Sequence, residues 1–386
     1  MKLQTILVVA FVLACRLVTQ AATEFPKIEQ GDIVPHDNRL TKPIDKSKAD
    51  ELTIVSFNVR NWGTRPRSLA HFEVLADLVD EADVAVFQEV GLGLLDKDED
   101  ISDKEGKRLD AIEALLRINL GEGWNIVRSP KSTDANVSSS NEVGLVAYKV
   151  KCNGYTASLT WEEFVDLGEL RDMAVFKLTL TKSDESREIL LGSVHLKPEE
   201  PERVEQMDKV ADWILARPSD VQVIVMGDFN WGYPTKSPTH SAEKRIIKLH
   251  DEEKLFMPFR HISYLKKASA TQLRTNLGAR KEGHFYDQFL MSSSLAGELA
   301  DGGELLKDCG IISLEKRLKE PVKKYTKLRT YGLGRYLKHA EIDLESDADA
   351  KTAHDKAAKN VAGLAVNDAS FLISDHRPIW VQLKVW

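Results

Sequence analysis

Short apolar runs that end in a polar or charged residue recur along this chain. They are rich in Val, Ile, Leu and Phe, which is typical of β-strands, and segments with helical spacing separate a few of them. This pattern predicts a strand-rich α/β protein, most simply a sandwich of two sheets with helices outside. The expected strands are 52–57, 83–87, 124–127, 143–150, 173–181, 189–195, 221–226, 285–291 and 379–385, and the expected helices are 69–79, 108–120 and 202–216.

The first residues have the pattern of a cleaved secretory signal. Lys2 precedes an apolar run at 6–15, and Thr19 and Ala21 place small residues before the expected cleavage point. The apolar run is shorter than the roughly 20 residues that a membrane span needs. We therefore expect a signal peptide at 1–21, an N-terminal arm at 22–50, one domain at 51–386, and a secreted, extracellular protein without stable membrane association.

Composition limits the partners of the chain. The 386 residues are 42% hydrophobic, which excludes a largely disordered protein, and the net charge of −7 excludes a general attraction to polyanions. Affinity for nucleic acid would then require bound cations or a local basic patch. The charged segment at about 302–370 interrupts the strand pattern and is expected to be an insertion, which is either a solvated face or such a patch.

Two cysteines follow the expected signal. Cys152 and Cys309 leave open a disulfide or two buried thiols, because an oxidising compartment permits either. The triplet that begins at Asn136 is a glycosylation sequon, which predicts a surface loop there.

Polar side chains follow many of the predicted strands. A single one is most simply a strand cap or a turn former. Their recurrence predicts instead that the strand ends converge on one edge of the sandwich. There they would gather carboxylates, amides and imidazoles into one site, which consists of Asn58, Glu89, His195, Asp228, Asn230, Asp287, Asp375 and His376.

Several short motifs in this order resemble the endonuclease/exonuclease/phosphatase superfamily, and within it most closely secreted deoxyribonuclease I. The superfamily's opening, metal-ligand, central and closing motifs are matched by Ser-Phe-Asn-Val-Arg at 56–60, Gln-Glu-Val at 88–90, Met-Gly-Asp-Phe-Asn at 226–230 and Ile-Ser-Asp-His-Arg-Pro at 373–378. Arg-Asp-Met-Ala-Val-Phe-Lys at 171–177 and Tyr-Asp at 286–287 resemble deoxyribonuclease I itself.

The resemblance implies a four-layer α/β/β/α sandwich of two mostly antiparallel sheets with flanking helices. It also implies a role for each matched residue. The implied catalytic residues are His195, His376, Glu142, Asp287 and Asp228, the implied metal ligands are Glu89, Asn58 and Asp375, and the implied substrate contacts are Asn230, Arg60 and Arg171.

These residue types suit the hydrolysis of a phosphodiester. An imidazole near its ordinary pKa can accept or donate a proton at neutral pH, and carboxylate and amide oxygens suit Mg²⁺. We expect a secreted endonuclease that cuts DNA with Mg²⁺ or Mn²⁺, with Ca²⁺ as a further candidate ion. The alternatives are a phosphatase or sphingomyelinase-type phosphodiesterase of the same superfamily, and a non-catalytic, toxin-like binding protein.

Overall fold

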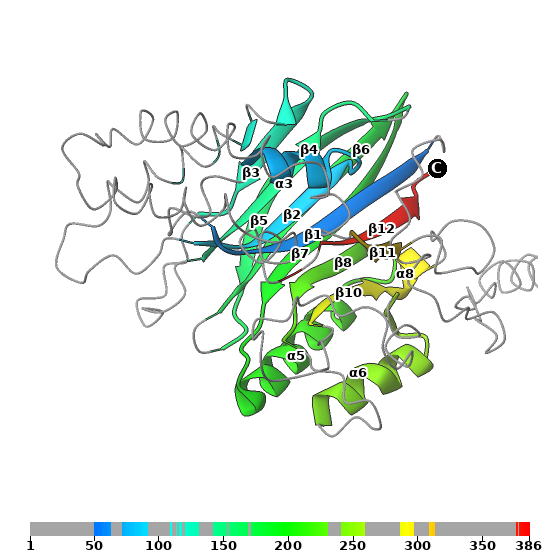
Figure 1. Cartoon of the computed structure of the whole chain (residues 1–386). Coiled ribbons are helices and arrows are strands. Elements are labelled where there is room, and N and C mark those ends of the chain that lie inside the picture. The colour runs from blue at the N-terminus through cyan, green and yellow to red at the C-terminus, as the bar shows by residue number, and fades with distance from the viewer. Residues whose placement is uncertain are drawn as a thin grey trace, which may run out of the picture.

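The computed structural model describes the strand core of the chain together with several of its helices (Figure 1). The described residues are 50–62, 72–91, 109, 113, 116–117, 120–130, 142–152, 154–168, 171–230, 241–258, 286–296, 309–312, 376 and 378–386.

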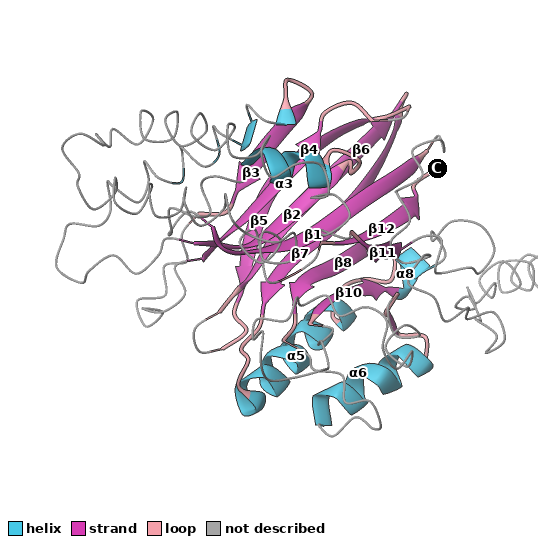
Figure 2. Ribbon diagram, viewed as in Figure 1, coloured by secondary structure: helices cyan, strands magenta, loops and turns pink. Residues whose placement is uncertain are grey.

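Two sheets of six strands form the centre of the molecule, and strands dominate the described part (Figure 2). In spatial order, the first sheet contains β11 (Cys309–Ile311), β12 (Ile379–Lys384), β1 (Glu51–Trp62), β2 (Val84–Gly91), β4 (Glu142–Lys149) and β3 (Trp124–Arg128). The second contains β5 (Thr156–Val165), β6 (Met173–Lys182), β7 (Glu185–His195), β8 (Gln222–Asp228), β10 (Asp287–Ser292) and β9 (Leu255–Phe256).

Strand pairing within the sheets is mostly antiparallel, as predicted. The parallel pairs are β1 with β2 in the first sheet and β7 with β8 in the second. Parallel neighbours need a crossover connection, and helices supply it in both places. The helix α3 (Phe72–Val79) precedes β2, and α5 (Glu200–Leu215) lies between β7 and β8.

The core between the sheets is built from alternate residues of the strands. On β8, Ile224 and Met226 join this inner core, whereas Val223 and Val225 belong to a second apolar cluster on the outer face. A strand that is buried on both faces reads as a continuous apolar run, as 223–226 does.

Helices cover the outer faces. Residues of α5 and of α6 (Ser241–Asp251) pack in the outer cluster of the second sheet, and Figure 1 shows both helices below β8 and β10. The helix α3 is drawn across the first sheet, and its Leu75, Leu78 and Val79 are almost fully buried. A short helix, α8 (Ser293–Ala296), follows β10. The predicted four-layer α/β/β/α sandwich is confirmed.

The structure adds elements that the sequence pattern did not predict. These are β5, α6, α8, the two-residue β9 and β11. Because β11 pairs with β12, residues 309–311 of the segment at 302–370 belong to the first sheet. The other residues of that segment, except Ile312, lie outside the described part, as do residues 1–49 and the sequon at Asn136.

Cys152 and Cys309 form no disulfide in the structure. Cys309 is fully buried in the inner core, and Cys152 packs against the same cluster. Of the two possibilities that the sequence left open, the structure therefore has two thiols. In the part of the chain that the structure describes, no helix is long and apolar enough to cross a membrane.

Candidate active site

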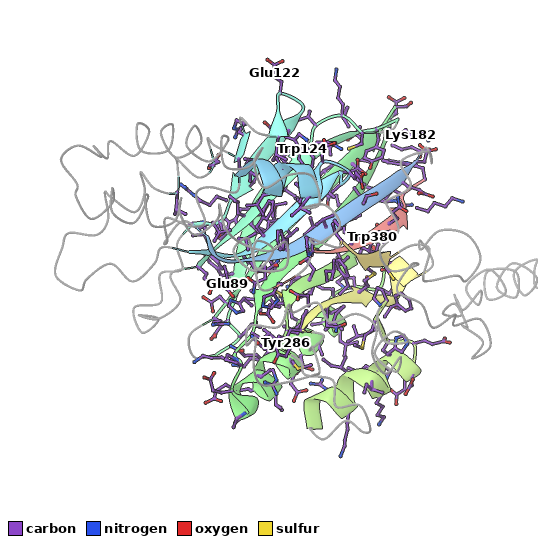
Figure 3. All side chains as sticks on the ribbon, in the orientation of Figure 1. Glu89, Glu122, Trp124, Lys182, Tyr286 and Trp380 are labelled. Carbon is purple, nitrogen blue, oxygen red and sulfur yellow. The ribbon has the colours of Figure 1, made fainter. Side chains whose placement is uncertain are left out.

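The candidate site lies at one end of the sandwich, where several strands finish. Figure 3 shows Glu89 and Tyr286 at this end, while Glu122 and Lys182 lie at the other. His195 pairs with Asp228 across β7 and β8, and Asp228 pairs with Asp287 across β8 and β10. Three of the predicted site residues are thus neighbours in sheet register.

Unusual backbone conformations shape two of these strand ends. Gly227, just before Asp228, has a φ of 140°, and a Cβ there would lie 2.0 Å from the carbonyl oxygen of Val194, so only glycine fits. Glu89 has a φ of 56° and sits where the register of β2 with β4 shifts. A bulge of this kind changes the direction in which a side chain projects.

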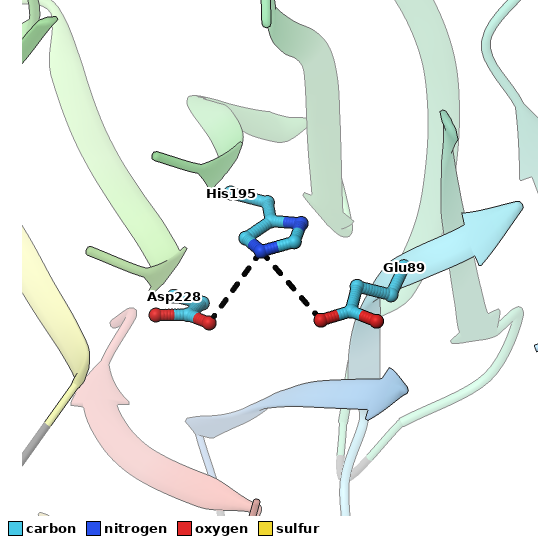
Figure 4. A group of neighbouring side chains, drawn as sticks. All are labelled: Glu89, His195 and Asp228. Atoms are coloured by element: carbon cyan, nitrogen blue, oxygen red, sulfur yellow. Dashed lines mark ion pairs between the residues drawn. The ribbon is translucent and has the colours of Figure 1, made fainter. Parts of the chain in front are cut away.

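His195 is paired with Glu142 from the facing sheet. Its Nδ1 lies 2.8 Å from Oε2 and 3.0 Å from Oε1 of the carboxylate, which fixes the orientation of the ring. With Nδ1 held in this way, Nε2 is the nitrogen that faces the remaining acidic groups. It lies 3.5 Å from Oε1 of Glu89 and 3.6 Å from Oδ2 of Asp228 (Figure 4).

The pair shifts the pKa of both partners. Burial alone would lower the pKa of His195, but the charge of Glu142 and its hydrogen bond raise this pKa above 6.5. Burial alone would raise the pKa of Glu142, but the charge and hydrogen bond of His195 hold this pKa below 4.5. Both shifts favour a protonated imidazole beside an ionised carboxylate.

His376 forms a second pair of the same kind. Its Nδ1 lies 2.8 Å from Oδ2 of Asp287, and the exposed fractions of the two side chains are 5% and 1%. The ring of Tyr286 lies 6.3 Å from the imidazole ring, between centroids. Burial and the nearby charge of Asp228 raise the pKa of the Tyr286 hydroxyl, which keeps it neutral.

The two pairs converge on Asp228. The Nε2 atoms of His195 and His376 each lie 3.6 Å from the same atom, Oδ2 of the Asp228 carboxylate. Asn58 donates from Nδ2 to this oxygen at 3.0 Å and to Oε1 of Glu89 at 2.9 Å. In this arrangement the Asn58 amide holds two carboxylates as a donor, whereas the resemblance implied an oxygen ligand for metal.

A simple alternation would place Asp228 and Asn230 on the same face of one extended strand. The structure does not place them in this way. The strand β8 ends at Asp228, Asn230 has a φ of 47°, and its N–H donates to Oδ1 of Asp228 at 2.7 Å. Asparagine tolerates this left-handed conformation, and an aspartate side chain often caps such a turn. The amide of Asn230 donates from Nδ2 to the carbonyl of Leu196 at 2.7 Å.

Arg171, one of the implied substrate contacts, precedes β6 and is engaged with the backbone. Its Nη1 donates to the carbonyl oxygen of Leu196 at 2.7 Å and to that of His195 at 3.1 Å. It also lines a cavity of about 50 Å³ together with Glu89, Glu142 and His195.

A buried amide below the site was not predicted as a functional residue. Gln88 donates from Nε2 to the hydroxyl of Ser193 and accepts from that of Ser56, both at 3.3 Å, so that it links the two sheets. Its position immediately before Glu89 in an otherwise apolar strand was the available signal. Sequence alone does not show which strand faces such an amide.

The carboxylates of Glu89 and Asp228 fit a divalent cation. One oxygen from each and Nε2 of His195 all lie within 4.8 Å of one another. Two carboxylates this close repel each other in a largely buried site, and a cation relieves that repulsion. Carboxylate oxygens suit Mg²⁺, Mn²⁺ and Ca²⁺ among the biological metals.

Two other predicted residues cannot be placed in this geometry. Asp375 lies outside the described residues. Arg60 is on β1, but its side chain is outside the described part. Their implied roles in metal and substrate binding stay predictions.

No protein-family model and no curated protein matches the sequence. Solved structures do match. The human Nocturnin catalytic domain is 16% identical, with 64% of this chain and 84% of that chain covered and a TM-score of 0.38. A humanized D. rerio TDP2 is 14% identical, with 86% and 99% covered and a TM-score of 0.46. An endonuclease/exonuclease/phosphatase family protein from Bacteroides thetaiotaomicron is 14% identical, with 87% and 98% covered and a TM-score of 0.41.

At these identities and TM-scores, the similar structures support no assignment of activity or substrate to this chain. The topology is instead established by strand pairing. The strands form two six-stranded sheets, with the acidic and imidazole side chains at one end. This arrangement agrees with the four-layer sandwich that the sequence resemblance implied.

Proposed function

We propose that this protein is a metal-dependent phosphodiesterase that cuts DNA as a secreted endonuclease. The observation that carries the proposal is the convergence of two histidine–carboxylate pairs on one buried carboxylate oxygen of Asp228. Hydrolysis of a phosphodiester needs a base for the attacking water and an acid for the leaving oxygen, and one phosphate is small enough to contact both imidazoles.

The two pairs divide the proton transfers between them. Glu142 holds Nδ1 of His195, and Asp287 holds Nδ1 of His376, so each ring presents Nε2 to the substrate. The raised pKa of His195 favours its protonated form, which suits the acid that protonates the leaving oxygen. His376, supported by Asp287, the most deeply buried of the described carboxylates of the site, accepts the proton of the attacking water.

Glu89 and Asp228 would hold the metal ion, with Asp375 as the further ligand that the resemblance implies. When bound, a divalent cation neutralises charge on the phosphate and polarises its oxygens. Asn58 keeps the two carboxylates together through its amide. Asp228 also stabilises positive charge on either imidazole, because it faces both.

DNA is the proposed substrate because the motifs beyond the shared superfamily core resemble secreted deoxyribonuclease I. The acidic chain would rely on the metal ion and on local cationic side chains to approach the DNA backbone. The expected signal at 1–21 supports a secreted location. In a secreted protein the sequon at Asn136 would be open to N-glycosylation.

A substrate panel tests this proposal. The chain from residue 22 onward is incubated with plasmid DNA, sphingomyelin vesicles and inositol phosphates, first with Mg²⁺ and then with excess chelator. We expect plasmid nicking that needs Mg²⁺ and is lost in His376→Ala. Hydrolysis of the lipid or inositol phosphate alone would favour the phosphatase or sphingomyelinase-type alternative. A folded protein that is inert in every arm would favour a binding protein.

A further inference from the structure

Two of the three side chains that sequence resemblance assigns to substrate binding converge on one backbone carbonyl. Arg171 and Asn230 both donate to the carbonyl oxygen of Leu196, each at 2.7 Å. Leu196 follows His195 directly and is fully buried, so its carbonyl is part of the buried backbone next to the catalytic imidazole. A cation that donates to a buried carbonyl forms one of the stronger hydrogen bonds in a protein.

The end of β7 is held unequally on its two sides. Toward β8 the ladder continues through His195, which pairs with Asp228, and the N–H of Leu196 donates to the carbonyl of Asp228 at 2.8 Å. Toward β6 the last paired residues are Ala174 and Ser193, two positions before His195.

Beyond that last pair, the Arg171 side chain provides a link between the β6 side and the end of β7. Its Nη1 reaches the carbonyls of both His195 and Leu196. Backbone carbonyls that are withdrawn from water need a partner, and these two receive one from the guanidinium. Removal of the guanidinium would leave the His195 backbone fixed on one side.

We propose that Arg171 is a positioning residue, which fixes the backbone of His195 and thereby sets the place of its imidazole relative to Asp228. This inference rests on the proposed function, in which His195 transfers a proton. It departs from the role that the resemblance implied, namely contact with a substrate phosphate. The two roles predict different kinetics on a substrate that has a single phosphate.

The kinetic test compares plasmid DNA with bis(p-nitrophenyl) phosphate, a diester without neighbouring phosphates. For Arg171→Ala, a positioning role predicts that kcat falls about tenfold to a hundredfold on both substrates while KM stays unchanged. A contact with a flanking phosphate predicts a higher KM for DNA and unchanged turnover of the small diester. That second result would overturn the proposal.

A conservative variant and a matched control complete the kinetic test. Arg171→Lys keeps the charge, but its ammonium ends one bond short of the position of Nη1, the atom that donates to both carbonyls, so we expect a reduced kcat here too. Arg245, on α6, likewise donates to a backbone carbonyl and a carboxylate, both of Asp208 on α5. Wild-type kcat in Arg171→Lys, or an equal loss in Arg245→Ala, would contradict a specific role in positioning.

A readout without turnover separates this proposal from the proposed function. The His195 side chain is 11% exposed, and its ring is held against Glu142. We expect diethyl pyrocarbonate to modify His195 several times faster in Arg171→Ala than in wild type or Arg245→Ala, as peptide mass spectrometry would show. Equal rates in all three would overturn the positioning role. Faster modification in a protein that hydrolyses neither diester would refute only the proposed function.

Discussion

Replacing Glu142 by glutamine is expected to destabilise the fold in a pH-dependent way. The substitution keeps the shape of the side chain but removes the charge that faces Nδ1 of His195 at 2.8 Å. A hydrogen bond to a charged group contributes about 1.5–3 kcal/mol, and the Glu142 side chain is 27% exposed, so we expect the lower end, about 1.5–2 kcal/mol.

The sign of the pH dependence follows from the two pKa shifts. The raised pKa of His195 gives stability that is complete below 6.5 and is lost as the pH rises through the folded-state pKa. The lowered pKa of Glu142 gives stability that is complete above 4.5 and is lost as the pH falls through its folded-state pKa. The pair therefore stabilises the folded protein most between pH 4.5 and pH 6.5.

Urea unfolding of wild type and Glu142→Gln at about pH 5.5 and about pH 9.5, in chelator, measures this contribution. Chelator is needed because a bound cation would add its own stabilisation. We expect a loss of about 1.5–2 kcal/mol at the lower pH and of less than about 1 kcal/mol at the higher pH. Equal losses at both, or a larger loss at the higher pH, would refute the charged pair.

Three further predictions concern the strand end, the thiols and the second histidine. Gly227→Ala should lower the free energy of unfolding in urea by at least about 3 kcal/mol, because the added Cβ would clash with the Val194 carbonyl. Gly123→Ala, whose added Cβ would lie in open space, should lower it by less than about 0.5 kcal/mol, and similar values for the two variants would refute the predicted clash. Unreduced protein without residues 1–21 should yield two alkylated thiols, Cys152 and Cys309, after denaturation, and a disulfide-linked peptide would contradict this. In the folded protein the alkylation of Cys152 should be slow, because burial raises the pKa of its thiol to about 12. His376→Ala should lower kcat on plasmid DNA by at least about a hundredfold with an unchanged circular dichroism spectrum, and a change in KM alone would make it a binding residue.

Much of the fold was predictable because the central strands are buried on both faces. Part of each such strand is a continuous apolar run, at 173–176 in β6, 189–191 in β7 and 223–226 in β8. These runs lie within the predicted ranges 173–181, 189–195 and 221–226. The elements that were missed have weaker signals. On β5, Ala157 and Leu159 alternate with exposed polar residues and charged residues follow, as suits an edge strand.

The helix α6 was missed for a different reason. Its sequence is rich in Lys, Arg and His, and few of its residues are deeply buried, Ile246 and Leu249 among them. Such a narrow apolar stripe is a weak signal in the sequence, because the helix is stabilised by packing against its neighbour α5.

The grouping of the site residues followed from the polar strand ends, but their detailed roles did not. That His195, Asp228 and Asp287 are register neighbours depends on strand order, which a local pattern does not contain. The engagement of the Asn230 amide and of the Arg171 guanidinium with the Leu196 carbonyl depends on contacts across 34 and 25 residues of sequence. The family resemblance implied substrate contacts at both positions.

The measurement that tests the central claim most directly is the single-turnover rate of plasmid nicking in saturating Mg²⁺ for wild type, Asp228→Asn and Asp220→Asn. Asp228 faces Asn58 and both imidazoles, while Asp220 is an exposed aspartate in a turn. If one site built around Asp228 hydrolyses the phosphodiester, Asp228→Asn should lower the rate by at least about a hundredfold and Asp220→Asn should leave it unchanged. Equal rates for wild type and Asp228→Asn would contradict the claim.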